Sequence, residues 1–186
     1  MKIAYLGWGS LIWDQRELLT RGMWQKDGPA LPVEYARISN DGRLTLVLYS
    51  SAKQVDVLWI HADTEDLAEA IGNLRSREGC RREKIEYVSL MDNSCNCVAI
   101  PSLYKIVQKW AKEKDLDVVL WTGLSSNFKD KTKTLLNEKS AVAYLKGLNE
   151  AELSKAEEYI LNTPSQIQTN YRKAVTEALL DAEESV

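Results

Sequence analysis

The chain has little of what builds the commonest metal and redox sites. Its 186 residues include one histidine, His61, and three cysteines, Cys80, Cys95 and Cys97. A zinc site made of cysteine and histidine would need a further ligand from elsewhere, so we expect no metal. An odd number of cysteines fits free thiols in a reducing compartment better than it fits a disulfide framework.

Long apolar runs and an excess of positive charge are also missing. No stretch is long and apolar enough to span a bilayer, and residues 1–5 lack the apolar core and cleavage site of a signal peptide. The net charge of -3 gives no broad attraction for nucleic acid or an anionic membrane. We therefore expect a cytoplasmic protein that binds neither. The basic residues between positions 75 and 84 still suit a small anion.

Tryptophan and tyrosine are abundant, with six and eight copies against a single phenylalanine. These side chains combine a large apolar area with one polar group, which suits both pocket walls and an ordinary core. The 45% hydrophobic and 27% charged fractions are those of a globular protein. The length predicts a single domain, residues 1–186.

The order of the predicted elements indicates the fold class. We predict strands at residues 2–6, 32–39, 43–49, 55–61, 84–90 and 118–122, and helices at 64–75, 101–110, 140–148, 149–161 and 165–183. Strands come mostly first and helices mostly last, which favours an α+β fold over a doubly wound sheet. We expect the strands to curl into a barrel-like sheet with helices outside. The strands at 2–6, 43–49 and 55–61 should share one curved sheet.

Local signals place some boundaries within this scheme. Asn40-Asp41-Gly42 is a tight-turn signal between two alternating segments, so we predict a hairpin there. Asp63 or Thr64 is expected to cap the first helix. The pair Asn149 and Glu152 resembles a capping box at the start of the fourth helix.

A glycine-rich loop follows the first strand. The dinucleotide pattern G-x-G-x-x-G/A fails because Ile12 stands where the pattern requires its third glycine or an alanine. Neither a Walker loop nor a nucleophile elbow fits the segment either. What remains is a nest in which backbone N–H groups of residues 8–11 bind a carboxylate or an oxyanion, helped by the Ser10 hydroxyl. The alternatives are a plain turn without a ligand and a dyad of Ser10 with His61.

The same segment resembles the opening motif of the gamma-glutamylcyclotransferase-like family, in which it follows the first strand and forms the substrate loop. The residues that carry this resemblance are Tyr5-Leu6-Gly7-Trp8-Gly9-Ser10-Leu11. A second likeness is a strand and a helix followed by Arg77-Glu78-Gly79, because the family has a catalytic glutamate before a glycine at that place. Residues 27–29, 31–37 and 43–47 resemble a bacterial-type subgroup whose members are mostly of unassigned substrate.

The resemblance implies a fold, a reaction and a site. The fold is a mixed β-barrel with flanking helices in residues 1–122, extended by C-terminal helices in residues 123–186. The activity is that of a cyclotransferase, an amide-cleaving transferase or lyase that needs no cofactor. It releases 5-oxoproline and a free amine from a small γ-glutamyl amide. Glu78 becomes the catalytic acid/base, and the substrate-binding residues become Gly7, Trp8, Gly9, Ser10 and Leu11.

Two departures from the family leave the substrate open. Trp8 stands where many members have tyrosine, and Leu11 where the eukaryotic type has asparagine. The amine half could be an amino acid, the remainder of glutathione, a polyamine or a modified antibiotic. Other functions also remain: a non-catalytic module that binds a small carboxylate or a partner, or an amidohydrolase in which Glu78 activates water.

Further residues have both a functional and a structural interpretation. Glu78 is either the acid/base or a solvated glutamate paired with an arginine one turn away. Residues 121–123 end a buried strand and either line a pocket or pack in the core. Tyr171 and Arg172 either reach an anionic end of the substrate or lie on an exposed helix.

Overall fold

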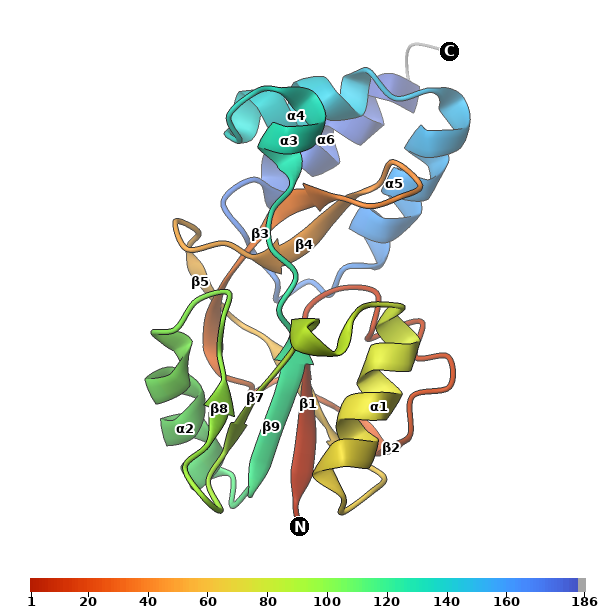
Figure 1. Cartoon of the computed structure of the whole chain (residues 1–186). Coiled ribbons are helices and arrows are strands. Elements are labelled where there is room, and N and C mark those ends of the chain that lie inside the picture. Colours follow the sequence, from red (N-terminus) through yellow and green to blue (C-terminus); the bar gives the residue numbers. More distant parts are fainter. Residues whose placement is uncertain (184–186) are drawn as a thin grey trace. The chain divides into compact units, whose positions relative to one another are not determined.

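The computed structural model describes residues 1–183, which fold into two compact units (Figure 1). The first unit comprises Met1–Leu31 and Asp56–Leu124, and the second comprises Pro32–Val55 and the chain from Ser125 onward. The division near Leu124 lies close to the start of the predicted C-terminal extension. The hairpin segment 32–55, however, groups with that extension.

A six-stranded mixed sheet forms the centre of the first unit. Its strand order is β2-β6-β1-β9-β7-β8, and β1 and β9 form its parallel pair. The strands are β1 (Ile3–Gly7), β2 (Thr20–Gln25), β6 (Leu58–Ala62), β7 (Ile85–Ser89), β8 (Cys95–Asn96) and β9 (Val118–Thr122). The helices of this unit are α1 (Leu67–Glu78), the short 3-10 helix η1 (Arg82–Lys84) and α2 (Leu103–Glu113).

Helix α1 is held on the sheet by the apolar positions that its sequence spacing predicts. Ala70, Ile71 and Leu74 are buried and pack in one cluster with residues of β1, β6, β7 and β9. Tyr5 belongs to this cluster, and its hydroxyl donates to the carbonyl of Ala70 at 3.3 Å. Burial raises the pKa of Tyr5 to about 12. The end of β1 is thereby fixed against the helix that carries Glu78.

The second unit combines a three-stranded sheet with helices. The sheet order is β4-β3-β5, from β3 (Ala30–Ile38), β4 (Leu44–Leu48) and β5 (Gln54–Asp56). The helices are α3 (Phe128–Thr132), α4 (Glu138–Lys146), α5 (Glu150–Asn162) and α6 (Arg172–Glu183). The predicted hairpin is confirmed, since β3 and β4 pair antiparallel around a turn in which Gly42 has φ 86°. The capping box of Asn149 and Glu152 is also confirmed.

The start of α6 is fixed by buried polar groups. Glu34 is 1% exposed, and its Oε2 accepts from the backbone N–H groups of Asn170 and Tyr171 at 2.9 and 3.3 Å. The Arg172 guanidinium donates to the carbonyls of Thr163, Pro164 and Ile167. Arg172 is therefore committed to the turn before α6, and its contacts favour a structural role over one in binding a substrate.

The α+β class is confirmed, but the sheet arrangement differs from the prediction. Both sheets are open within the described residues, so the strands form no closed barrel. The predicted strand 55–61 is two strands in different sheets, β5 and β6, separated at Val57. At Val57 the backbone forms hydrogen bonds with the segment 28–29. The N–H of Gly28 donates to the carbonyl of Val57, and the N–H of Val57 donates to the carbonyl of Pro29. The prediction that strands 2–6, 43–49 and 55–61 share one sheet is consequently wrong, because β4 belongs to the other sheet.

Several boundaries also differ. Asp66, rather than residue 63 or 64, is the N-cap of α1, and its carboxylate accepts from the N–H of Glu69 at 2.8 Å. The last helix begins at Arg172, seven residues later than the predicted 165, because residues 163–171 form the turn described above. Strand β2 and helix α3 are absent from the predicted elements, because their segments carry only a weak apolar pattern.

Gly123 makes room for a buried carboxylate, which gives a first prediction. Glu86 is 1% exposed and accepts from the N–H of Val98 and from the indole of Trp121, both at 2.9 Å. A Cβ on Gly123 would lie 2.4 Å from the Glu86 carboxyl carbon. Gly123→Ala should therefore lower the free energy of unfolding by about 1–3 kcal/mol through overpacking, measured by urea denaturation.

The matched control for this substitution is Gly72→Ala in α1, where an added Cβ meets nothing within 4 Å. Because alanine is the better helix former, we expect that variant to gain about 0.5–1 kcal/mol. Equal unfolding midpoints for Gly123→Ala and the wild type would show that the carboxylate is not confined as described.

Candidate functional site

Packing explains part of the loop that follows β1. A Cβ on Gly7 would lie 2.8 Å from the Trp24 ring, so glycine is required there by close approach. Trp8 and Leu11 are each 6% exposed, and Leu11 packs in the core cluster of the first unit. The Leu11 side chain thus contributes to stability, and what it offers a ligand is its backbone.

The loop turns without any left-handed residue. None of residues 7–11 has a positive φ, so it is not a nest of alternating right- and left-handed residues. Instead, the N–H of Ile12 donates to Gly9 O at 3.0 Å and the N–H of Asp14 to Ser10 O at 2.8 Å. Consecutive turns of this kind also present N–H groups on one side. Anion binding by the N–H groups of residues 8–11 stays a prediction.

Arg77 joins this loop to the predicted catalytic glutamate. It lies in the last turn of α1, and its side chain is 5% exposed. One edge of the guanidinium donates hydrogen bonds to the loop. Nη2 donates to Ser10 Oγ at 3.2 Å, and both Nε and Nη2 donate to the carbonyl of Asp14. Nη1 donates to Glu78 Oε1 at 2.8 Å. A single planar group therefore contacts both halves of the site.

Arg16 adds a second clamp between the loop and the end of α1. It has a left-handed backbone, with φ 50°, and its Nη1 donates to the carbonyl of Arg77 at 3.4 Å. Its Nε also pairs with Asp14 Oδ2 at 3.2 Å. Because Asp14 and Arg77 are bonded to each other as well, the three residues fix the loop against the helix terminus.

Glu78 is the last residue of α1, and its side chain is only 16% exposed. Burial raises the pKa of this carboxyl, while the charges of Arg77 and Arg16 act in the opposite direction. A proton shuttle needs a pKa that approaches the working pH from its ordinary value near 4. The environment of Glu78 shifts its pKa in that direction.

The glycine beside it has a local explanation. Gly79 has φ 59°, and its N–H donates to Ser76 O at 3.3 Å, while the next N–H, of Cys80, reaches Arg75 O at 3.4 Å. This is the usual left-handed glycine that ends a helix. Gly79 therefore sets where α1 ends, and in doing so it fixes Glu78 beside the loop.

The ion pair formed by Glu78 also distinguishes the two interpretations of this residue. The solvated alternative requires an exposed carboxylate paired with an arginine one turn away. Instead, its partner is the adjacent Arg77, and both side chains are largely buried.

No family model, curated protein or solved structure matches this chain. The features of this chain that point to a function are the geometry of Ser10, Arg77 and Glu78 and the resemblance of the two motifs.

The contacts of the other candidate residues from the sequence favour the structural interpretation of each. Ser10 accepts from Arg77, and in the described part of the chain it has no hydrogen bond to His61, whose ring packs edge-on against Trp59 at 5.0 Å. Trp121 is fully buried and bonded to Glu86, so it belongs to the core.

The three cysteines are free in the structure. Burial raises the pKa of Cys80, and the nearby charge of Glu78 raises it further. Burial, followed by the neighbouring Cys95, raises the pKa of Cys97 to about 12. The thiols of Cys80 and Cys97 are therefore poor nucleophiles at neutral pH. Within residues 1–183 no group of three or more His, Cys, Asp or Glu is placed to hold a metal ion, and no helix there has the length and apolarity to cross a membrane.

Arg77 is the site residue that sequence reasoning missed. The basic run from 75 to 84 suggests a solvated face, but the spacing contains a contrary signal. Ala70, Ile71 and Leu74 mark the buried side of α1, and position 77 lies three residues after Leu74 on that same side. An arginine on a buried helix face needs partners, and these are the loop and Glu78.

Proposed function

We propose that the chain is a γ-glutamyl cyclotransferase in which Glu78 is the general acid/base. The observation that carries this proposal is the contact of one guanidinium, that of Arg77, with both Ser10 and Glu78. The two motifs lie far apart in the sequence, and each alone is weak. Their direct connection through a buried arginine is what a shared site requires, and it supports the resemblance independently of sequence pattern.

The reaction needs a folded-back substrate and one proton shuttle. The Glu78 carboxylate takes a proton from the substrate α-ammonium, and the freed amine attacks its own γ-carbonyl to close a five-membered ring. The amide C–N bond then breaks as the departing nitrogen takes the proton back from Glu78. The regenerated carboxylate accepts the second proton of the ring nitrogen, which leaves neutral 5-oxoproline, and passes it to the released amine. Holding the chain in the attacking geometry supplies much of the rate, since intramolecular reactions reach effective molarities of about 10⁵–10⁸ M.

The loop supplies the groups that bind negative charge. Ser10 Oγ accepts from Arg77, so its own hydroxyl hydrogen can donate to the substrate. The N–H groups of residues 8–11 are the proposed donors to the α-carboxylate and to the oxyanion that forms at the γ-carbonyl. Arg77 positions Ser10 and Glu78 without contacting the reacting atoms.

The proposal extends to the fold and the setting of the reaction. We propose that the α+β arrangement is an opened variant of the family's mixed β-barrel, with residues 123–186 as the helical extension. The chemistry uses no cofactor, and the substrate is a small cytoplasmic γ-glutamyl amide.

A substrate panel tests the proposal. The purified protein is incubated with glutathione, γ-glutamyl amino acids and a γ-glutamyl polyamine, and 5-oxoproline is measured by mass spectrometry. We expect release from at least one member, at a rate proportional to protein concentration. Glu78→Gln, purified in the same way, controls for contaminating enzymes. If no member yields 5-oxoproline above that control while 5-oxoproline still binds, the chain is a carboxylate-binding module instead.

A further inference from the structure

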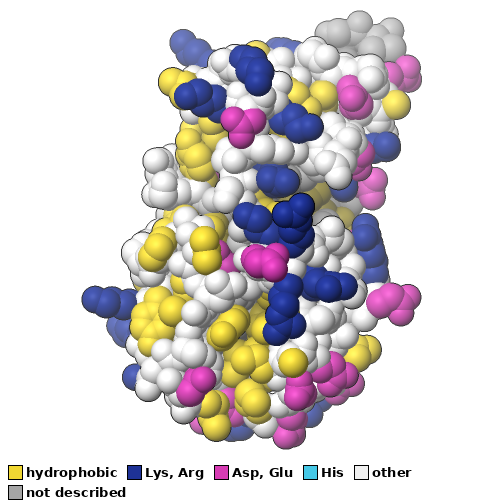
Figure 2. Space-filling model, in the orientation of Figure 1, with side chains coloured by type: hydrophobic (Ala, Val, Ile, Leu, Met, Phe, Trp, Pro, Cys, Tyr) yellow, Lys and Arg dark blue, Asp and Glu magenta, His cyan; other side chains and the backbone are white. Residues whose placement is uncertain are grey.

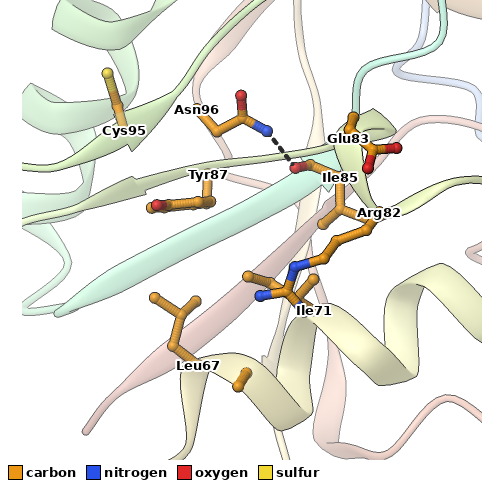
Figure 3. Close-up of a pocket in the computed structure, with 9 residues that line it drawn as sticks. Leu67, Ile71, Arg82, Glu83, Ile85, Tyr87, Cys95 and Asn96 are labelled. Atoms are coloured by element: carbon orange, nitrogen blue, oxygen red, sulfur yellow. Dashed lines mark hydrogen bonds between the residues drawn. The ribbon is translucent and has the colours of Figure 1, made fainter.

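A hollow of about 670 Å³ lies in the first unit between α1 and the outer strands of the sheet (Figure 3). Its volume is within the range of small-molecule sites, about 300–1,000 Å³. Glu78 and the loop residues 7–11 are not among the residues that line it. These are Leu67, Ala68, Ile71, Arg82, Glu83, Ile85, Tyr87, Cys95 and Asn96.

The floor of the hollow is apolar. Ile71 and Ile85 are 5% and 1% exposed and belong to the core cluster, against which Leu67 and Tyr87 also pack. Figure 2 shows hydrophobic side chains gathered on this face of the first unit, with basic side chains beside them. Such a floor favours an aromatic or branched aliphatic group, because burying it removes apolar surface on both partners from water.

One wall carries an unpaired positive charge. Arg82 is exposed, and its side chain has no hydrogen bond or ion pair among the described residues. Figure 3 shows its guanidinium extended over Ile71, while the Glu83 carboxylate points away from it. A guanidinium free of an internal carboxylate and lying at the edge of an apolar floor selects a carboxylate, sulfonate or phosphate group.

The other wall offers neutral polar groups. The Asn96 side-chain Nδ2 donates to Ile85 O at 2.8 Å, which fixes the amide and leaves its oxygen as an acceptor (Figure 3). The Tyr87 hydroxyl has no partner within residues 1–183 and can donate. The hollow thus combines one cation, an apolar floor and two orienting polar groups, the usual composition of a ligand pocket.

We propose that this hollow binds a small molecule with an aromatic or branched aliphatic body and one anionic group, which pairs with Arg82. The proposal does not depend on the cyclotransferase activity, since none of its residues belongs to the candidate active site. It therefore assigns the protein a second ligand site.

The test uses 8-anilino-1-naphthalenesulfonate, an aromatic anion whose fluorescence rises in apolar surroundings. We expect saturable binding with one site per chain. Phenylacetate should compete for that site, whereas phenylacetamide, which has the same body without the charge, should compete about tenfold or more weakly, because a hydrogen bond to a charged group is lost.

Two variants locate the binding site. Arg82→Gln should weaken binding of the sulfonate about tenfold, while the matched Arg81→Gln, at an exposed position outside the hollow, should leave it unchanged. Ala68→Trp fills the hollow from an exposed helix position and should abolish binding without unfolding the chain, which circular dichroism checks.

Three results would overturn the proposal. The first is an absence of saturable binding by the folded wild type. The second is binding that both Arg82→Gln and Ala68→Trp leave intact, which means that the probe occupies another place. The third is an affinity that falls as the protein concentration rises, which means that a second copy of the chain covers this face.

Discussion

Glu78→Gln should lower the rate of 5-oxoproline formation about 10²–10⁴-fold, the usual loss when a general acid/base is removed. Glutamine keeps the size and shape of the side chain and can still accept from Arg77, but it has no basic oxygen. The rate is measured with the best substrate of the panel under saturating conditions. Glu83→Gln, an exposed glutamate nearby, is the matched control and should be fully active.

Binding should suffer less than turnover, because the proposed donors to the substrate carboxylate lie in the loop and are unchanged. Calorimetry with 5-oxoproline should show affinities of the wild type and Glu78→Gln within about tenfold. The acid limb of the wild-type rate profile should also lie above the ordinary titration range of a glutamate. The active base is the ionised form, and burial raises the pKa at which that form is lost. Undiminished turnover in Glu78→Gln would remove this residue from the mechanism.

Arg77→Gln is expected to cause the largest loss of stability, about 3–5 kcal/mol by urea denaturation. It removes one partner of a largely buried ion pair and leaves the Asp14 carbonyl, Ser10 and the Glu78 carboxylate without their donor. Arg75→Gln, at an exposed position of the same helix turn, should change stability by less than about 0.5 kcal/mol.

A double-mutant cycle separates the ion pair from the rest of the Arg77 contacts. Because Glu78→Gln removes the charge that Arg77 compensates, Arg77→Gln should cost less in that background than in the wild type. Losses that simply add, or an Arg77→Gln variant as stable as Arg75→Gln, would show that Arg77 does not link the loop to Glu78.

Local pattern predicted those parts of the fold that depend on neighbouring residues. The 40–42 turn, the strand at Val118–Thr122 and the capping box at Asn149 all follow from contacts within a few residues along the chain. The division of residues 55–61 into two strands could not be read in this way. It depends on the backbone bonds of Val57 to the distant segment 28–29, and nothing in the alternating pattern around Val57 reports them.

Most residues of the candidate site could be predicted from the sequence, but the contacts through which Arg77 joins them could not. Ser10 and Glu78 follow from the resemblance, and Gly79 from the need to end a helix. Arg77 could have been placed from helical spacing alone, since it continues the buried side of α1. Its partners could not, because they depend on how residues 10–16 fold back on the helix terminus, with Arg16 in a left-handed conformation that only tertiary contacts maintain.

The most direct test of the central claim is the fate of solvent oxygen during turnover. The wild-type protein is incubated with its substrate in heavy-oxygen water, and the products are separated and their masses measured. Intramolecular attack by the α-amino group uses no water, so 5-oxoproline should be the first γ-glutamyl product and carry no heavy oxygen, and Glu78→Gln should form almost none of it. Free glutamate carrying one heavy oxygen as the first product would contradict the account, because it would show that Glu78 activates water and that the enzyme is an amidohydrolase.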